Sequence, residues 1–404
     1  MAPSTFGWVD FAAGDREKMA EVIKLFSEPD SRDELGLGTV RDALSNLLFP
    51  GTSTLQTRAR YFLFIPWVYL SHERRRTSSK EIALKARGDE VKLIRLLKES
   101  GEKHGVIGMD AGESLERLPS AVYWSGLSVW GIRHHPGSQE SYHRHFDRLE
   151  YRARVGNGSE EGDPMGPGHV SSWDPQLPDA PEDFLKQATF SLRQEEARYL
   201  QQRLMNLRPH SLLAHLVSQT RPQEKLDFIW NHPEAEGFPP RLRAQVEHAR
   251  TFSELMHGAA LLYNAMIAQL LPHREDLATD YEQGFSDWAR LIGARQELRT
   301  WSREAFWTLI HDTGAQVSLA SRRFIDGWID RALEGSTPAN LMSDAGAREQ
   351  IRRRELELKG AQRARLSNTR ARERWTGASG DRALDYRWFR ARQLTADILH
   401  GVET

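Results

Sequence analysis

Apolar residues recur at helical spacing along almost the whole chain, and this periodicity restricts the fold more than any other feature. Clear examples are Met19, Val22, Ile23 and Phe26 in the first segment, and Leu255, Ala259, Leu262, Met266 and Leu270 in a later one. Side chains three or four residues apart lie on one face of an α-helix. Strand-like pieces such as Val106 and Ile107 are too short to build a sheet. We therefore predict a mainly α, multi-helix fold with two to three subdomains and little β-sheet.

The same pattern gives the approximate position of each helix. We expect helices at about residues 14–27, 39–48, 53–76, 79–102, 119–132, 138–152, 192–218, 240–271, 275–293, 301–312, 318–334 and 345–374, and a final helix after Leu384.

Residues 154–182 are rich in glycine and proline, a composition that resists both helix and strand. We interpret this segment as the main linker. The predicted domains are an N-terminal helical domain at 1–153, the linker at 154–182, a central helical domain at 183–344 and a basic C-terminal helical region at 345–404.

Composition narrows the class of protein. The chain contains no cysteine, which excludes disulfides, thiolate metal sites and a cysteine nucleophile. Its longest apolar run, Tyr61 to Leu70, is about half of the ~20 residues that a membrane-spanning helix needs. The first residues resemble no signal peptide. We expect a cytoplasmic protein without a membrane segment and without a cofactor.

Positive charge is concentrated at the C-terminal end. The last sixty residues contain fourteen Arg or Lys and eight Asp or Glu, whereas the whole chain has a net charge of −1. Arginine beside aromatic residues is suited to contact with phosphate. We therefore predict that this end binds DNA or RNA, through Arg363, Arg365, Arg370, Arg374, Arg387, Arg390 and Arg392. Docking of an acidic protein partner, or pairing with carboxylates of the same chain, are the alternatives.

A second candidate site lies after Pro50 and Gly51. Ser53 and Gln56 have the spacing of a capping box, which predicts a helix start. Free N–H groups there, with the hydroxyls of Thr52, Ser53 and Thr54, form a candidate anion-binding site. The Walker lysine of a nucleotide-binding loop is missing.

Arg58 and Arg60 interrupt an otherwise apolar helix, so each charge needs a partner or an exit to solvent. We consider three roles for them: internal pairs with Asp42 or Glu34, contacts with a nucleic-acid backbone, or catalysis. The second role adds Arg58 and Arg60 to the predicted nucleic-acid contacts.

Aromatic residues and histidines follow between residues 118 and 147. Tyr123, Trp124, Leu127 and Trp130 share one side of a helix, which favours core packing over a base-stacking platform. The histidines near Asp147 do not have a recognised zinc spacing, and we predict no metal site from them. They are His134, His135, His143 and His145.

Glu355, Glu357 and Lys359 contain a Glu-x-Lys triplet that metal-dependent nucleases of the restriction type also carry. In those nucleases the triplet ends a core strand, whereas here it lies in helical sequence. A divergent metal-dependent nuclease is therefore an alternative, and a non-catalytic protein is favoured.

Several stretches together resemble an uncharacterised prokaryotic family classed as a domain of unknown function. The most specific is Phe49-Pro-Gly-Thr-Ser-Thr-Leu-Gln-Thr-Arg, and others are Trp8-Val-Asp-Phe, Leu118-Pro-Ser-Ala-Val-Tyr-Trp and Asp385-Tyr-Arg-Trp. The resemblance implies a companion of helicase- or nuclease-containing anti-phage defence operons, and it supplies no catalytic residues. The resulting hypothesis is a non-catalytic subunit of a bacterial antiviral defence complex that contacts nucleic acid.

Overall fold

The computed structural model describes residues 33–109, 115–147, 172–219, 226–333 and 337–404. These ranges are helical and contain no named strand, only the isolated bridges Arg133–Trp173 and Phe184–Gln187. The predicted mainly α fold is confirmed. Within the same ranges, no helix combines the length and the apolar character that crossing a membrane requires. The helix expected at residues 14–27 lies outside the described residues.

The chain groups into two compact units. Unit 1 contains Met1–Leu44 and Pro239–Asp385, and unit 2 contains Ser45–Phe238 and Tyr386–Thr404. Each unit thus combines segments that are far apart in sequence, whereas the predicted division was sequential. Of the predicted linker, residues 154–171 lie outside the described residues. Residues 172–182 pack within unit 2, where Pro178 accepts a hydrogen bond from the Trp67 indole at 2.7 Å.

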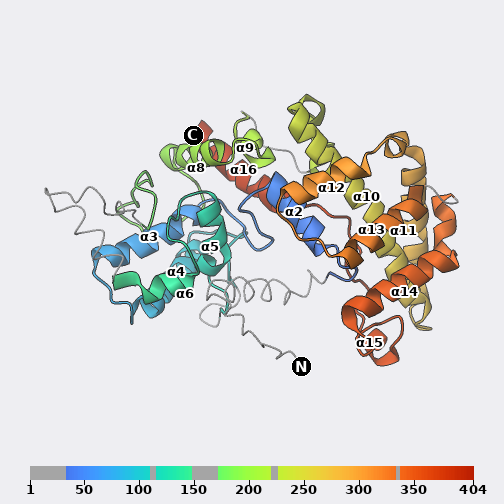
Figure 1. Cartoon of the computed structure of the whole chain (residues 1–404). Coiled ribbons are helices and arrows are strands. Elements are labelled where there is room, and N and C mark those ends of the chain that lie inside the picture. Colours follow the sequence, from blue (N-terminus) through green and yellow to red (C-terminus); the bar gives the residue numbers. More distant parts are fainter. Residues whose placement is uncertain (1–32, 110–114, 148–171, 220–225, 334–336) are drawn as a thin grey trace, which may run out of the picture. The chain divides into compact units, whose positions relative to one another are not determined.

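Unit 2 is built from short and medium helices (Figure 1). They are α3 (Tyr61–Arg74), α4 (Ile82–Glu99), α5 (Pro119–Val129), α6 (Gln139–Arg144), α8 (Gln194–Leu207), α9 (Leu212–Val217), the 3₁₀ turns η3 (Ile229–Asn231) and η4 (Ala235–Gly237), and α16 (Trp388–Glu403). Helix α3 packs on α4 and α5, while α8, α9 and α16 pack on one another. The boundary between the units falls inside α2 (Gly38–Leu48).

Helix α3 is the centre of an aromatic core. A helix that is apolar all round has to be buried all round, and every residue from Tyr61 to Tyr69 is buried. The Phe62 ring stacks on Trp130 with centroids 3.8 Å apart. The aromatic stripe of α5 is also buried, so its predicted role in core packing is confirmed.

Helix α3 begins at Tyr61 and not at Ser53, so the predicted helix start is wrong. Half of the expected capping box forms, because Gln56 Oε1 accepts the backbone N–H of Ser53 at 3.2 Å. The Gln56 amide also donates to the Gly51 carbonyl at 3.0 Å. Gln56 therefore closes a turn of the loop instead of capping a helix.

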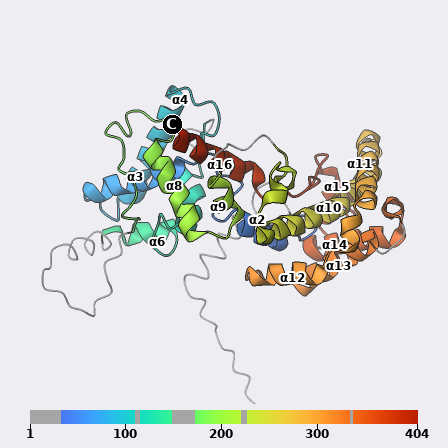
Figure 2. The same ribbon diagram turned by 90° about the horizontal axis from the view of Figure 1, so that it is seen from above.

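Unit 1 is organised around one long helix, α10 (Pro240–Gln269). Its other elements are α11 (Glu275–Ala294), η5 (Gln296–Arg299), α12 (Arg303–Asp312), α13 (Leu319–Leu333), η6 (Pro338–Met342), α14 (Ala345–Lys359) and α15 (Thr369–Glu373). Helices α11, α13 and α14 all pack against α10 (Figure 2).

A glycine lets α11 approach α10 closely. A Cβ atom at Gly258 would lie 2.3 Å from the Trp288 indole, far inside van der Waals contact. The same indole donates to the Glu254 carbonyl of α10 at 2.7 Å. The large side chain of α11 therefore fits because the facing position of α10 has no side chain.

Two helices end earlier than the periodicity predicted. The segment expected as one helix at 345–374 stops at Gly360, whose φ of +69° is the left-handed conformation that favours glycine at a helix end. The chain then turns and forms only the short α15. Similarly, the segment expected at 192–218 is divided into α8 and α9.

Unit 2 also contains a fully buried carboxylate. Glu90 of α4 accepts hydrogen bonds from the backbone N–H of Ser120 at 2.8 Å and from its hydroxyl at 2.7 Å. It thereby caps the first turn of α5, where Pro119 is at the first helical position. Burial nevertheless raises the pKa of Glu90 to about 7, against the lowering effect of Ser120 and Arg87.

Because of the shifted pKa of Glu90, we predict that the unfolding free energy of the chain depends on pH. Because its pKa is higher in the folded than in the unfolded chain, the folded chain binds more protons between the two values. The contribution of the Glu90 carboxyl to the unfolding free energy is therefore largest below pH 4.5 and is lost as the pH rises to about 7. Glu90→Gln keeps an acceptor without the charge. Relative to wild type, it should gain roughly 3 kcal/mol of unfolding free energy between pH 5 and pH 8.

Denaturant unfolding at both pH values measures this difference. Glu99→Gln is the control, since Glu99 lies on the same helix with an exposed side chain. An equal pH response in wild type and Glu90→Gln would contradict the prediction.

Candidate nucleic-acid interface

The predicted anion-binding loop of unit 2 presents its carbonyl groups to arginines of the same unit. Arg387 donates to the Thr52 carbonyl at 2.8 Å, and Arg390 donates to the Thr54 carbonyl at 2.8 Å. The Trp130 indole donates to the Pro50 carbonyl at 2.9 Å. The structure thus brings together two sets of residues that the sequence predicted as separate sites, and they contact each other.

The side chains of the loop have local roles. The Thr52 hydroxyl is buried and donates to the Phe49 carbonyl at 2.7 Å. The Ser53 hydroxyl is buried, and within the described residues it has no hydrogen-bond partner. Thr54 is exposed.

An internal carboxylate occupies the start of α3. Asp397 of α16 accepts the backbone N–H of Ala59 at 2.8 Å and the Nε–H of Arg58 at 2.9 Å. The Tyr123 hydroxyl accepts the N–H groups of Thr57 at 2.8 Å and Arg58 at 3.0 Å. Asp397 thus places an internal carboxylate at the backbone N–H of Ala59, which follows the loop of Thr52, Ser53 and Thr54 where we predicted an anion.

Arg60 is also paired inside unit 2. Its Nη2 lies 2.9 Å from the fully buried Glu196 of α8, and its Nη1 donates to the Thr189 carbonyl at 2.9 Å. Internal pairing of Arg58 and Arg60 was one of the predicted alternatives, but the predicted partners were wrong. Asp42 instead contacts Arg41.

Arg392, the last predicted arginine of unit 2, also bonds the backbone of a loop. Arg392 donates to the Leu226 carbonyl at 2.9 Å, which also accepts the Trp388 indole at 3.0 Å. Arg390 and Arg392 lie over the ring of Phe389, with guanidinium carbons 5.1 and 5.5 Å from its centroid. In unit 2, each predicted arginine therefore has an internal partner.

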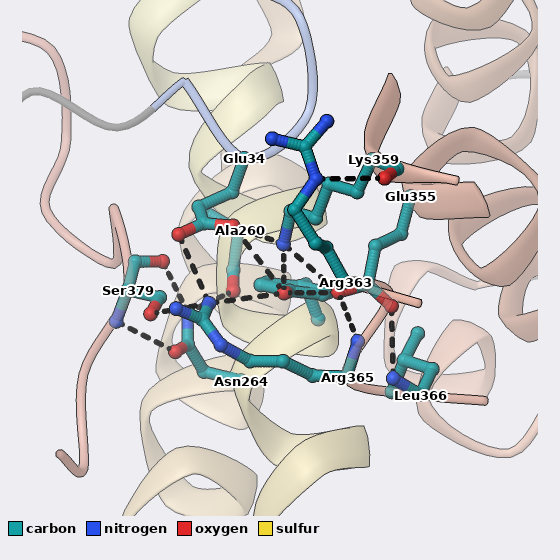
Figure 3. Close-up of polar contacts among 10 residues, drawn as sticks. Glu34, Ala260, Asn264, Glu355, Lys359, Arg363, Arg365, Leu366 and Ser379 are labelled. Atoms are coloured by element: carbon teal, nitrogen blue, oxygen red, sulfur yellow. Dashed lines mark hydrogen bonds and ion pairs between the residues drawn. The ribbon is translucent and has the colours of Figure 1, made fainter. Parts of the chain in front are cut away.

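In unit 1, Arg365 belongs to an ionic cluster (Figure 3). Its Nη1 lies 2.9 Å from Oε1 of Glu34, and Lys359 is ion-paired with the same carboxylate. The Tyr263 hydroxyl of α10 lies at the centre, where it donates to Glu355 at 2.6 Å and accepts from Lys359 at 2.7 Å.

Glu355 fixes the turn after α14. Its carboxylate accepts the backbone N–H groups of Arg365 at 2.8 Å and Leu366 at 2.9 Å. Burial opposes its charge, but hydrogen bonds from Tyr263, Lys359 and Leu366 outweigh that effect and lower the pKa of Glu355. The carboxylate is thus ionised and structural at neutral pH.

The nuclease triplet is divided by this arrangement. Glu355 and Lys359 meet in the cluster, whereas Glu357 pairs with Arg353 at 3.5 Å and Arg354 at 3.7 Å. Across the described ranges, no group of three or more His, Asp or Glu side chains is placed to hold a metal ion.

Three of the predicted arginines point to solvent. Arg363, Arg370 and Arg374 are exposed, in or beside α15. Arg363 uses its Nε–H on the Lys359 carbonyl at 3.1 Å, and its guanidinium is directed away from the cluster in Figure 3. Within the described residues, Arg370 and Arg374 have neither a side-chain hydrogen bond nor an ion pair. We call these three residues the exposed arginine set.

A model of one protein family, described as "Family of unknown function (DUF6361)", matches residues 3–400. The chain belongs to this family. No curated protein and no solved structure matches it. Membership in DUF6361 is consistent with the resemblance found in the sequence, and it names no activity.

Sequence reasoning missed the residues that neutralise the arginines. Asp397 and Glu196 lie more than a hundred residues from Arg58 and Arg60, and no local pattern connects them. Glu34 was considered, but for the wrong arginine. The spacing of Glu355 and Lys359, four residues apart in a helix, was the one available signal of the cluster.

Asp397 is expected to hold unit 2 together. Asp397→Asn keeps one acceptor but leaves Arg58 without a full counter-charge, which should lower the unfolding free energy by about 2 kcal/mol. Denaturant unfolding of the full chain measures the loss. The control is Glu403→Gln, an exposed residue of the same helix. A change as small as the control's would show that Asp397 is dispensable.

Proposed function

We propose that this protein is a non-catalytic helical subunit that binds the phosphate backbone of DNA or RNA through the exposed arginine set. The observation that carries the proposal is the exposure of Arg363, Arg370 and Arg374, whereas the other predicted arginine of unit 1, Arg365, is ion-paired with Glu34. An exposed guanidinium group whose terminal nitrogens have no internal partner can bind phosphate oxygens with them.

The local arrangement supports contact with a polyanion. Residues 360–376 contain five arginines and one acidic residue, Glu373. Arg370 and Arg374 are four residues apart around α15, so their side chains lie on the same side. One surface segment therefore offers several cations to neighbouring phosphates.

The same segment favours binding without sequence preference. Its aromatic residue, Trp375, is buried and offers no ring for base stacking. Phosphate contacts position a protein on nucleic acid but do not read its sequence. We therefore expect similar affinity for unrelated sequences of equal length.

Replacing Arg363, Arg370 and Arg374 together with Gln should weaken binding of an oligonucleotide. Each lost phosphate contact lowers the slope of log affinity against log salt, so the triple variant should lose roughly two to three units of slope. Fluorescence anisotropy over a salt series measures both affinity and slope.

The control carries the same charge change elsewhere in unit 1. Arg241, Arg299 and Arg323 are also exposed, and replacing them with Gln should leave binding nearly unchanged. If wild type binds no duplex or single strand at about 50 mM salt, where phosphate contacts are strong, the proposal fails. Equal losses of affinity in both triple variants would show that the total charge of the protein, and not a defined site, determines binding.

Membership in an anti-phage defence complex is the second part of the proposal, and it rests on the family resemblance. Purification from native cells should recover a helicase or nuclease together with nucleic acid. Loss of that partner after nuclease treatment supports joint binding to nucleic acid. A partner that survives the treatment favours an adaptor that docks an acidic protein.

A further inference from the structure

Two cations and one hydroxyl of unit 1 surround a single carboxylate. Oε1 of Glu34 lies 2.9 Å from Nη1 of Arg365, and its Oε2 contacts Nζ of Lys359. The Tyr263 hydroxyl is 3.4 Å from the same Oε2. The Glu34 side chain is only 5% exposed, and Figure 3 shows the side chains of Lys359 and Arg365 directed at its carboxylate.

The charges of this site balance only when Glu34 is present. Without Glu34, the cations of Lys359 and Arg365 face one carboxylate, that of Glu355. Glu355 cannot turn to serve both, because two backbone N–H groups and Tyr263 hold its oxygens. One positive charge is then left in a half-buried site, where an unpaired charge is costly.

The chemistry of the enclosure is that of a phosphate site. An ammonium group and a guanidinium group directed at one point bind oxyanions through charge-assisted hydrogen bonds. The carboxylate of Glu34 presents two oxygens in the position where phosphate oxygens would bind.

Only the side chain of Glu34 has to move for an exchange. Its backbone is fixed on both sides, since Asp33 accepts the N–H groups of Leu37 and Gly38 at 2.6 Å each, and Arg354 donates to the Leu35 carbonyl at 2.9 Å. These bonds do not involve the Glu34 carboxylate, so a rotation of that side chain breaks none of them.

We propose that Lys359, Arg365 and Tyr263 form a phosphate-binding cradle, which the Glu34 side chain fills until a phosphate group displaces it. The cradle rests on the proposed function and extends it. Arg363 bonds the Lys359 carbonyl, and Arg372 bonds the Arg365 carbonyl at 3.3 Å, so the cradle and the exposed arginine set belong to one turn of chain. Glu34 then limits the affinity of that surface for nucleic acid.

The test uses Glu34→Gln, which keeps the size of the side chain but removes the charge that holds it against Lys359 and Arg365. Oligonucleotide affinity at low salt should rise roughly tenfold, with about one unit of additional salt slope. Adding Lys359→Gln or Arg365→Gln to this variant should abolish the gain. The control is Glu349→Gln, which removes an exposed carboxylate from the same helix as Lys359. Equal gains in the two single variants would overturn the proposal, because bulk charge would then explain them.

Inorganic phosphate supplies a readout that does not need nucleic acid. At matched ionic strength, phosphate should raise the melting temperature of Glu34→Gln, or restore its folding if it is unstable, and should leave wild type nearly unchanged. No phosphate effect and no gain in oligonucleotide affinity would sink the cradle while leaving the exposed arginine set intact. Phosphate stabilisation without any nucleic-acid binding would sink the proposed function and leave the cradle.

Discussion

Neutralisation of buried arginine by carboxylates from distant parts of the chain is the interaction on which both units depend. A cation taken out of water is costly unless a counter-charge and hydrogen bonds satisfy it. In unit 2, Asp397 and Glu196 meet this need for Arg58 and Arg60. They also join α16 and α8 to the start of α3. Because each pair connects segments that are far apart in sequence, it adds a long-range contact to those of the aromatic core.

The same chemistry explains why a basic sequence does not produce a uniformly basic surface. Asp397 lies at the start of α3 and pairs with Arg58, and Glu34 pairs with Lys359 and Arg365, so each carboxylate neutralises cations of its own unit. The two positions differ in one respect. Asp397 bonds a backbone N–H that cannot move away, whereas the partners of Glu34 are side chains. Exchange with a phosphate is therefore easier to achieve at Glu34.

The sequence predicted the helical class and the aromatic core because both follow from local spacing. Tyr123, Trp124 and Trp130 had to share a face, and that face is buried. The predicted start of α3 was wrong because the Gln56 side chain bonds backbone groups of the loop instead of capping a helix. Whether each arginine is paired or exposed could not be predicted from its neighbours in the sequence either. Arg365 and Arg363 are two residues apart with similar neighbours, yet Arg365 meets Glu34 and Arg363 points to solvent.

This contrast bears on why the exposed arginine set exists at all. Arginines that hold loops, such as Arg387 and Arg392, are explained by the carbonyl groups they satisfy. Arg370 and Arg374 satisfy nothing within the described residues, and exposed charges of one sign on a short helix repel each other. Their effect on stability is therefore neutral or slightly unfavourable. Because stability does not account for Arg370 and Arg374, their exposure agrees with the proposed contact to an external anion.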